Sequence, residues 1–411
     1  MNAAMMLTLV AITYRGCEYN LSNAHSRYLV YTEVARCLDT FPETHGKWRI
    51  EWGPAGYQPP TGGPDISEMY VVRDADDSSN LAIVIRGTNF FSAIDWMSNF
   101  PLLPKHWEYG NAGSDVKISE STRFGLRLLQ HLQSGEVPAQ DAAQTDIEKV
   151  AAARTAKESA AVYALMKKVF AGVTKSDGTD LIEKTRARAI ADAQDIVAAG
   201  KDSRLAQAQA EAEKPSPTSR TLLEYLRVAM ASGTPPKNIY IVGHSKSGAL
   251  APALALWLAD TQGRSVEPSA QWDPDRKARL HVYTFAGPTP GNAAFTARFQ
   301  SAPTIVERYR SANPFDIVPH VWNPTEIKEI SGLYRDQLTF LKVPADVVAA
   351  SVKIFGYEHE GAAQQGDWPD VMQPNFLERA AVEHLDGYLK QFKIYDERNM
   401  NTLALFAPVA R

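Results

Sequence analysis

The chain has 411 residues, of which 45% are hydrophobic and 22% are charged, values close to those of globular proteins. This composition argues against a disordered chain and against a membrane-spanning one. A net charge of −4 offers no broad attraction for polyanions, so nucleic acid is not an expected partner. The two cysteines, Cys17 and Cys37, are too few for a disulfide framework and lack the paired spacing of a zinc site, so no metal is expected.

An apolar stretch occupies residues 1–14 and resembles the core of a secretion signal. It lacks a basic segment before it and a small-residue cleavage site after it, so the pattern favours a first core helix. We therefore expect no clear signal peptide, and a protein that is either cytoplasmic or exported by a signal-independent route.

The next elements predict the start of an α/β domain. Residues 48–64, rich in Gly and Pro, indicate a loop and hairpin. Strands are predicted at 66–73 and 81–86, and the second is a continuous apolar run typical of the middle of a sheet. A helix is predicted at 121–132.

A shift in composition marks residues 135–219, which are rich in Ala, Lys, Glu, Asp and Gln. Two helical stretches are separated by Ser176-Asp177-Gly178, and Pro215-Ser216-Pro217 closes the segment. The pattern predicts a helical hairpin inserted into an α/β domain made of residues 1–134 and 220–411. The hairpin could serve as a cap, a lid or a partner-binding element.

Strands and helices alternate after the insertion. The expected elements are a helix at 221–230, a strand at 237–242, a helix ending near Asp260, a strand at 280–285, a helix after Pro290 and a strand at 306–311. This alternation predicts an α/β fold with a mostly parallel, three-layer sheet flanked by helices.

The most informative motif follows the strand at 237–242. There Gly243-His244-Ser245-Lys246-Ser247-Gly248 leads directly into a helix of small residues. A strand, a tight turn carrying serine and a helix together make a nucleophile elbow, whose helical N–H groups face a developing oxyanion. Gly243 and Ser247 satisfy its need for small neighbours two positions from the serine. We therefore predict Ser245 as a nucleophile.

A serine nucleophile needs a base and an acid that orients the base. Asp316 is the candidate acid because it follows a strand, at the edge where α/β sheets gather catalytic groups. His320 is so near Asp316 in sequence that a fixed loop would point the two apart. His359, between two glutamates, is an alternative base, and we prefer His384.

Four sequence blocks resemble the class 3 (fungal-type) lipase family of the α/β-hydrolases. They are Ile83-Val84-Ile85-Arg86-Gly87-Thr88 with Asp95-Trp96, Val242 to Ala251, Val282-Tyr283-Thr284-Phe285-Ala286-Gly287-Pro288 with Gly291-Asn292, and Asp316-Ile317-Val318-Pro319. The resemblance covers about residues 81–320, with a weaker match at His384 and Tyr388.

The resemblance implies a role for five residues. Ser245 would be the nucleophile, Asp316 the acid and His384 the base. Backbone N–H groups of Thr88 and Lys246 would form the oxyanion hole, with the Thr88 hydroxyl assisting. No metal or organic cofactor is implied.

The resemblance also implies a lid, and it has three departures. The lid would fall between Asn89 and about Asp115, whose aromatic and aliphatic residues could equally be core. Ser247 stands where the family usually has glycine. The Lys246 side chain opposes the positive end of the helix dipole; we expect it to face solvent, and the alternative is a role in attracting anionic head groups. The insertion at 135–219 has no counterpart in the minimal fold.

The resulting functional prediction is a serine ester hydrolase acting on acyl lipids, a triacylglycerol lipase or carboxylesterase. One alternative is a phospholipase A-type hydrolase of membrane lipids, delivered as an antibacterial toxin, and another is a soluble short-chain esterase. A third, from another class, is a partner-binding protein that uses the insertion on a hydrolase scaffold. The expected partners are an acyl-ester lipid, a transient lipid interface and a protein bound through the insertion.

Overall fold

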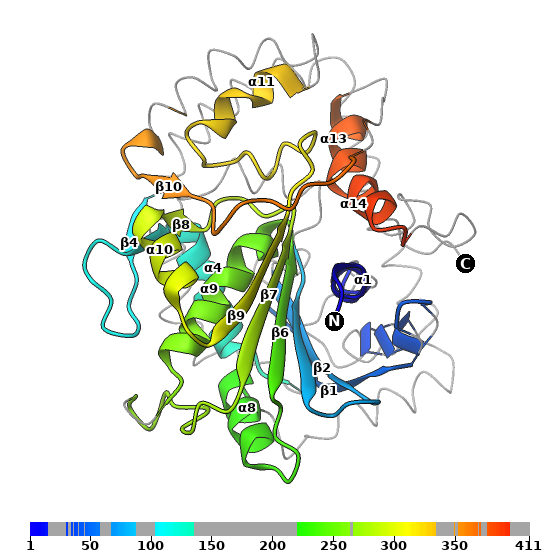
Figure 1. Cartoon of the computed structure of the whole chain (residues 1–411), viewed down its shortest axis with the longest axis vertical. Coiled ribbons are helices and arrows are strands. Elements are labelled where there is room, and N and C mark those ends of the chain that lie inside the picture. The colour runs from blue at the N-terminus through cyan, green and yellow to red at the C-terminus, as the bar shows by residue number, and fades with distance from the viewer. Residues whose placement is uncertain are drawn as a thin grey trace, which may run out of the picture.

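A six-stranded mixed sheet with helices on both faces organises the molecule (Figure 1). This computed structural model describes residues 1–14, most of 30–57, 67–87, 103–134, 220–263, 266–333, 349, 352–368, 370 and 376–394. The predicted helical hairpin at 135–219 lies outside these residues, so the division into two domains stays a prediction. In the described part of the chain, no helix combines the length and apolarity needed to cross a bilayer.

The sheet is mostly parallel on the side that carries the elbow. Its order is β1 (Trp48–Tyr57), β2 (Ser67–Asp74), β3 (Asn80–Ile85), β6 (Asn238–His244), β7 (Arg279–Phe285) and β9 (Ile305–Ser311). β3, β6, β7 and β9 pair in parallel, whereas β1–β2 and β2–β3 pair in antiparallel fashion. The predicted α/β class and mostly parallel sheet are confirmed.

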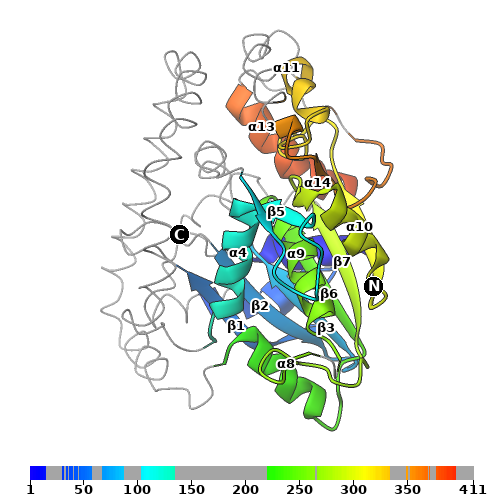
Figure 2. The same cartoon turned by 90° about the vertical axis from the view of Figure 1, so that its left-hand side faces the viewer.

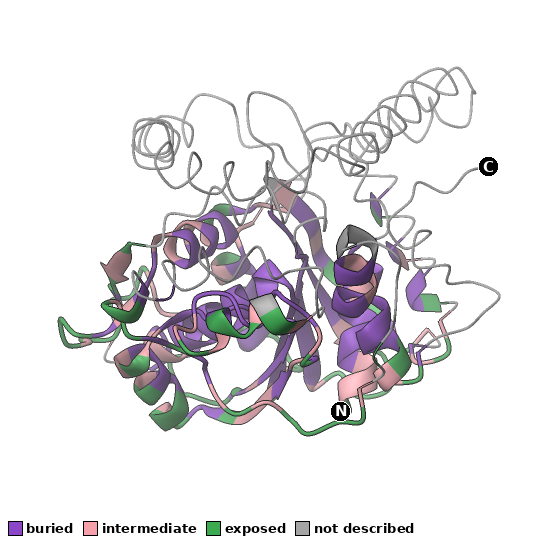
Figure 3. Ribbon diagram, turned by 90° about the horizontal axis from the view of Figure 1, so that it is seen from above, coloured by how far each residue is buried: buried purple, intermediate pink, exposed green. Residues whose placement is uncertain are grey.

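Alternation along the strands divides the core into two layers. In β6, Ile239 and Ile241 join the cluster that contains α4 (Glu120–His131), α8 (Leu222–Ala231) and α9 (Lys246–Asp260). Tyr240 and Val242 join the opposite cluster, with α1 (Ala3–Ile12) and α14 (Asp386–Gln391). Successive side chains of a strand point to opposite faces, so a continuous apolar run can serve both layers. Figure 2 shows α4, α8 and α9 on one face, and Figure 3 shows that the central strands are buried.

The expected first core helix is present. α1 is buried along most of its length, and it packs against β3, β6 and β7. The Asn2 side chain caps its N-terminus by accepting the N–H of Met5 at 2.8 Å. The apolar N-terminal stretch is thus part of the hydrophobic core.

A second sheet and a third cluster lie beyond the ends of the central strands. The small sheet has the order β10 (Tyr357–Glu358), β8 (Gly291–Asn292), β5 (Lys117–Ser119) and β4 (Pro104–His106). The third cluster joins Val318, Trp322 and Tyr357 to α13 (Phe376–His384). The other elements are α10 (Ala293–Ser301), the 3₁₀ helix at Glu326–Lys328 and α11 (Ile330–Leu333). These parts surround the sheet edge at which the elbow lies (Figure 1).

One expected element differs. Residues 48–57, expected as loop and hairpin, form the edge strand β1. Register shifts flank Trp52, and the Gly53-Pro54 pair lies within them. An edge strand tolerates proline and irregular pairing because half of its backbone groups need no partner strand. The Gly and Pro content therefore marks a bulged edge strand.

Candidate active site

The predicted nucleophile elbow is formed at the end of β6. Ser245 has φ 62° and ψ −131°, a left-handed conformation that is costly for a residue with a side chain, and it is 1% exposed. Its N–H donates to the Phe285 carbonyl at 2.9 Å, and its carbonyl accepts the Gly248 N–H at 2.8 Å. These bonds hold the strained turn between a strand and the start of α9.

The structure explains the small residues on both sides of Ser245. A Cβ on Gly243 would lie 2.0 Å from the Ser247 carbonyl oxygen, so only glycine fits there. The Ser247 hydroxyl accepts the His244 N–H at 2.9 Å and lies 2.7 Å from the Ile85 carbonyl. The departure from the usual glycine therefore adds a link between the elbow and β3.

The candidate acid and base are in contact. His384 Nδ1 lies 2.8 Å from Asp316 Oδ2, and the two side chains are 1% and 0% exposed. Asp316 Oδ1 accepts the Val318 N–H at 3.0 Å, and Tyr388 donates its hydroxyl to Oδ2 at 3.2 Å. Burial and the Asp316 charge raise the pKa of Tyr388 well above its usual value, so its hydroxyl stays a donor. Asp316 is thus oriented from three directions.

The same contact separates His384 from its rivals. His384 ends α13, and its carbonyl oxygen lies 2.9 Å from Nε2 of His244, the residue before Ser245. His359 lies against Glu326, with Nε2 to Oε2 at 3.1 Å. His320 lies 3.3 Å from the Pro314 carbonyl. The structure thus brings His384, and neither rival, to both Asp316 and the elbow.

One side of the candidate oxyanion hole lies within the described residues. Lys246 is the first residue of α9, where N–H groups have no carbonyl partner inside the helix. Thr88 lies outside the described residues. The residue before it, Gly87, is the last described residue of this segment and lies beside the elbow. A Cβ on Gly87 would lie 2.9 Å from Ser245 Cβ and 2.4 Å from the His244 carbonyl oxygen. The chain therefore passes the nucleophile at backbone distance just before Thr88.

The Lys246 side chain departs from expectation, because it is 4% exposed and does not face solvent. Its Nζ lies 3.3 Å from Ser67 Oγ, near the buried ion pair of Arg86 with Glu68. Side chains in the first turn of a helix lean back toward its N-terminus, which here directs Lys246 at the start of β2. Burial, reinforced by the Arg86 charge, lowers the pKa of Lys246 to about 7.

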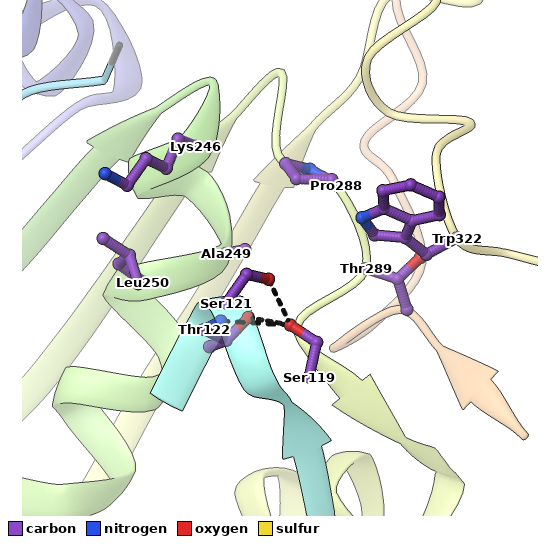
Figure 4. Close-up of a pocket in the computed structure, with 9 residues that line it drawn as sticks. All are labelled: Ser119, Ser121, Thr122, Lys246, Ala249, Leu250, Pro288, Thr289 and Trp322. Atoms are coloured by element: carbon purple, nitrogen blue, oxygen red, sulfur yellow. Dashed lines mark hydrogen bonds between the residues drawn. The ribbon is translucent and has the colours of Figure 1, made fainter. Parts of the chain in front are cut away.

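A small pocket opens beside the elbow (Figure 4). Its lining comes from the first turns of α9, the start of α4, the segment after β7 and Trp322, and comprises Ser119, Ser121, Thr122, Lys246, Ala249, Leu250, Pro288, Thr289 and Trp322. One wall carries three hydroxyl groups, because Ser119 accepts the Thr122 N–H and contacts the hydroxyls of Ser121 and Thr122. The pocket therefore presents both polar and apolar groups beside the first turn of α9.

Most of the expected lid lies outside the described residues. Its end, residues 103–115, forms β4 and a loop attached to the domain body. Trp107 Nε1 donates to Asp260 at 2.7 Å, and Arg298 donates to the Gly110 carbonyl at 2.6 Å. This part is a fixed border, so the lid prediction reduces to the stretch before residue 103.

Sequence reasoning did not assign a role to Tyr14 or Asn313. Tyr14 contacts His244, and the Asn313 amide donates to the Glu383 carbonyl at 3.0 Å, which ties the loop before Asp316 to α13. His384 ends α13 and Tyr388 lies in the next helix, α14, so the contact of Tyr388 with Asp316 could not be derived from helical spacing. No local pattern links Tyr14 to residues more than two hundred positions away.

Part of the chain matches a known protein family. Residues 217–326 match the family model Lipase (class 3), a segment that contains both Ser245 and Asp316. The class 3 lipase resemblance is confirmed. The match places the chain among the carboxylic ester hydrolases.

One solved lipase structure shares the fold of this chain. The crystal structure of M37 lipase is 23% identical, with a TM-score of 0.66 over 99% of this chain and 97% of that one. A triacylglycerol lipase from Penicillium expansum is 12% identical, with a TM-score of 0.36 over 78% of this chain and 72% of that one. None of the curated proteins matches. The class 3 lipase resemblance thus rests on the family segment, and the M37 lipase structure shows the same overall fold.

Proposed function

We propose that this protein is a serine ester hydrolase that acts on acyl lipids. The observation that carries the proposal is the buried contact of His384 with Asp316. The backbone carbonyl of His384 also accepts a hydrogen bond from His244, the residue before Ser245. This arrangement supplies a base, an acid that orients it and a serine in a strained turn. The acyl-lipid substrate is inferred from the class 3 lipase family match.

The proposed reaction consists of two acyl transfers. His384 accepts the Ser245 proton as the hydroxyl oxygen attacks the ester carbonyl carbon, and a tetrahedral oxyanion forms. His384 then gives that proton to the alcohol oxygen, the C–O bond breaks, and an acyl-enzyme remains. Water repeats the sequence, releasing the acid and restoring Ser245. Asp316 holds the imidazole with Nδ1–H toward its carboxylate and stabilises the imidazolium.

Charge that develops on the carbonyl oxygen needs donors placed in advance. Lys246 is proposed to supply its backbone N–H from the positive end of α9. Thr88 is proposed to supply the second donor, and the passage of Gly87 alongside Ser245 supports that position. The reaction uses no metal ion or organic cofactor at any step.

The direct test is Ser245→Ala, assayed on a soluble p-nitrophenyl ester and on a triglyceride emulsion. We expect kcat to fall by several orders of magnitude, because removing a triad member removes the concerted step. His384→Ala should fall comparably, whereas His359→Ala, which removes the rival histidine, should retain most of the activity. Near-normal turnover by Ser245→Ala, or inactivation by His359→Ala alone, would overturn the assignment.

The lipid class is decided by a second assay. Hydrolysis across an acyl-length series, below and above substrate solubility, separates a lipase from a soluble short-chain esterase, since only a lipase should accelerate past the solubility limit. Cleavage of phospholipid vesicles without cleavage of triglyceride would instead favour the phospholipase alternative.

A further inference from the structure

A chain of contacts runs from the N-terminal segment to the candidate base. The Tyr14 hydroxyl lies 2.9 Å from His244 Nδ1, and His244 Nε2 lies 2.9 Å from the His384 carbonyl oxygen. The rings of His244 and His384 also pack together, with centroids 4.7 Å apart. His244 is 3% exposed and Tyr14 3% exposed, so bulk water does not compete for these bonds.

The His384 carbonyl, the acceptor at one end of this series of hydrogen bonds, determines which atoms in it carry hydrogens. A backbone carbonyl only accepts hydrogen bonds, so His244 Nε2 carries a hydrogen and donates it to His384. Burial, together with the neighbouring His384, holds the pKa of His244 well below its usual value, so its imidazole is neutral. A neutral imidazole with a hydrogen on Nε2 has a lone pair on Nδ1, which accepts the Tyr14 hydroxyl.

We infer that Tyr14 and His244 are positioning residues for the base: by donating to Nδ1, the Tyr14 hydroxyl stabilises the His244 tautomer that binds the main chain of His384. This inference rests on the proposed function, in which His384 is the base. The bond fixes the backbone from which the His384 side chain projects, while Asp316 fixes the ring itself. Without the bond from His244, the His384 side chain would keep its contact with Asp316 but would be less precisely oriented toward Ser245.

The position of Tyr14 is set by the whole N-terminal helix. α1 packs against β3, β6 and β7, and Tyr14 follows two residues after it. A Cβ on Gly87 would lie 2.2 Å from the Tyr14 hydroxyl, so glycine at that position is needed for the hydroxyl to lie between β3 and His244. Burial of α1 is thereby connected to the geometry of the active site.

The test compares Tyr14→Phe with a matched control in the full chain. Tyr70→Phe also removes a buried tyrosine hydroxyl from the α1 interface, where it donates to the Leu9 carbonyl at 2.5 Å, but it has no contact with His244 among the described interactions. We expect Tyr14→Phe to lower kcat on p-nitrophenyl butyrate about tenfold with KM nearly unchanged, and to slow labelling of Ser245 by an alkyl phosphonate to a similar extent. Tyr70→Phe should alter thermal stability and leave both rates unchanged.

A second pair tests the donor itself. His244→Gln places an amide N–H where Nε2 was and should retain most of kcat, whereas His244→Met fills the space without a donor and should lose about tenfold or more. Full kcat in Tyr14→Phe, equal losses in Tyr14→Phe and Tyr70→Phe, or equal losses in both His244 variants would overturn the inference. If His244→Met does not fold, the tyrosine comparison decides. Activity surviving in Ser245→Ala would instead overturn the proposed function, so the two failures are distinguishable.

Discussion

Lys246 is an unusual residue to find buried beside the candidate nucleophile, Ser245. Its backbone N–H suits the start of a helix, but its ammonium opposes the helix dipole, lies in a nearly dry site and is near the Arg86 guanidinium. These influences favour the neutral amine, which explains the lowered pKa. The charge pattern of the sequence could not reveal that Lys246 is buried, because a lysine on an exposed helix surface and a lysine packed beneath a strand occur in the same local sequence pattern.

The buried amine predicts a pH dependence of stability. The pKa of Lys246 is about 7 in the folded protein and about 10.4 in an unfolded chain. Between these values the unfolded chain holds a proton that the folded one has released, so the free energy of unfolding rises with pH, by up to about 1.4 kcal/mol per pH unit. Below pH 7 both states are protonated and this contribution is constant.

Lys246→Met should remove that rise. Urea unfolding of the two proteins at pH 7, 8 and 9 gives the comparison, and we expect the wild type to gain stability relative to the variant as pH increases. Parallel curves for the two proteins would show that Lys246 remains protonated in the fold.

At the scale of elements, the elbow depends on how closely a helix start and a strand end approach. A Cβ on Gly248 would lie 2.5 Å from the Gly287 Cα, so the first turn of α9 and the segment after β7 are in backbone contact. These two glycines belong to different sequence blocks of the class 3 lipase resemblance. Both positions require glycine because their backbones are in direct contact, which leaves no room for a side chain on either residue.

Gly248→Ala should therefore destabilise the protein by about 1–3 kcal/mol, although alanine favours helices, because the methyl group forces α9 away from Gly287. It should also lower kcat, since the shift moves the start of α9 and the Lys246 N–H. Gly233→Ala is the control, because a Cβ there meets nothing within 4 Å. Unfolding curves and esterase assays of both variants provide the measurement, and equal stability of the two would contradict the packing argument.

At the scale of the whole molecule, the residues that flank the compositionally distinct segment 135–219 lie side by side. The Ser134 N–H donates to the Arg220 carbonyl at 3.1 Å, and Gln133 forms an antiparallel bridge with Thr221. The Arg220 carbonyl also accepts Trp52 Nε1 at 2.7 Å. The body of the protein thus closes a hairpin-like connection at the point where the segment departs.

Replacing residues 135–219 by a Gly/Ser linker of about four residues should therefore leave the body folded, because the linker needs only to span a hairpin. We expect cooperative urea unfolding and retained hydrolysis of a soluble ester, since Ser245, Asp316 and His384 all lie outside the segment. Activity on emulsions or vesicles then reports whether the segment contributes at a lipid interface. An insoluble or inactive variant would show that the segment belongs to the catalytic domain, contrary to the predicted division.

Much of the candidate site could be predicted from local sequence. The strand, small turn and helix around Ser245 form a contiguous pattern, and the apolar runs at β3, β6 and β7 are typical of a buried parallel sheet. Local pattern failed where a residue's partner is distant in sequence. The Gly-Pro pair in β1 marked a loop until its pairing with β2 was known, and Lys246 appeared solvent-facing until β2 was placed over it.

The sequence by itself determined the α/β class, the elbow at Ser245 and the short set of histidines from which a base could come. Only the tertiary structure placed His384 and Tyr388 on Asp316 and joined Tyr14 to His244. The physical reason is the distance along the sequence over which each interaction acts. Backbone strain and strand periodicity are properties of neighbouring residues, whereas the orientation of a catalytic base depends on bonds between elements that meet only after the sheet and its two helical layers have assembled.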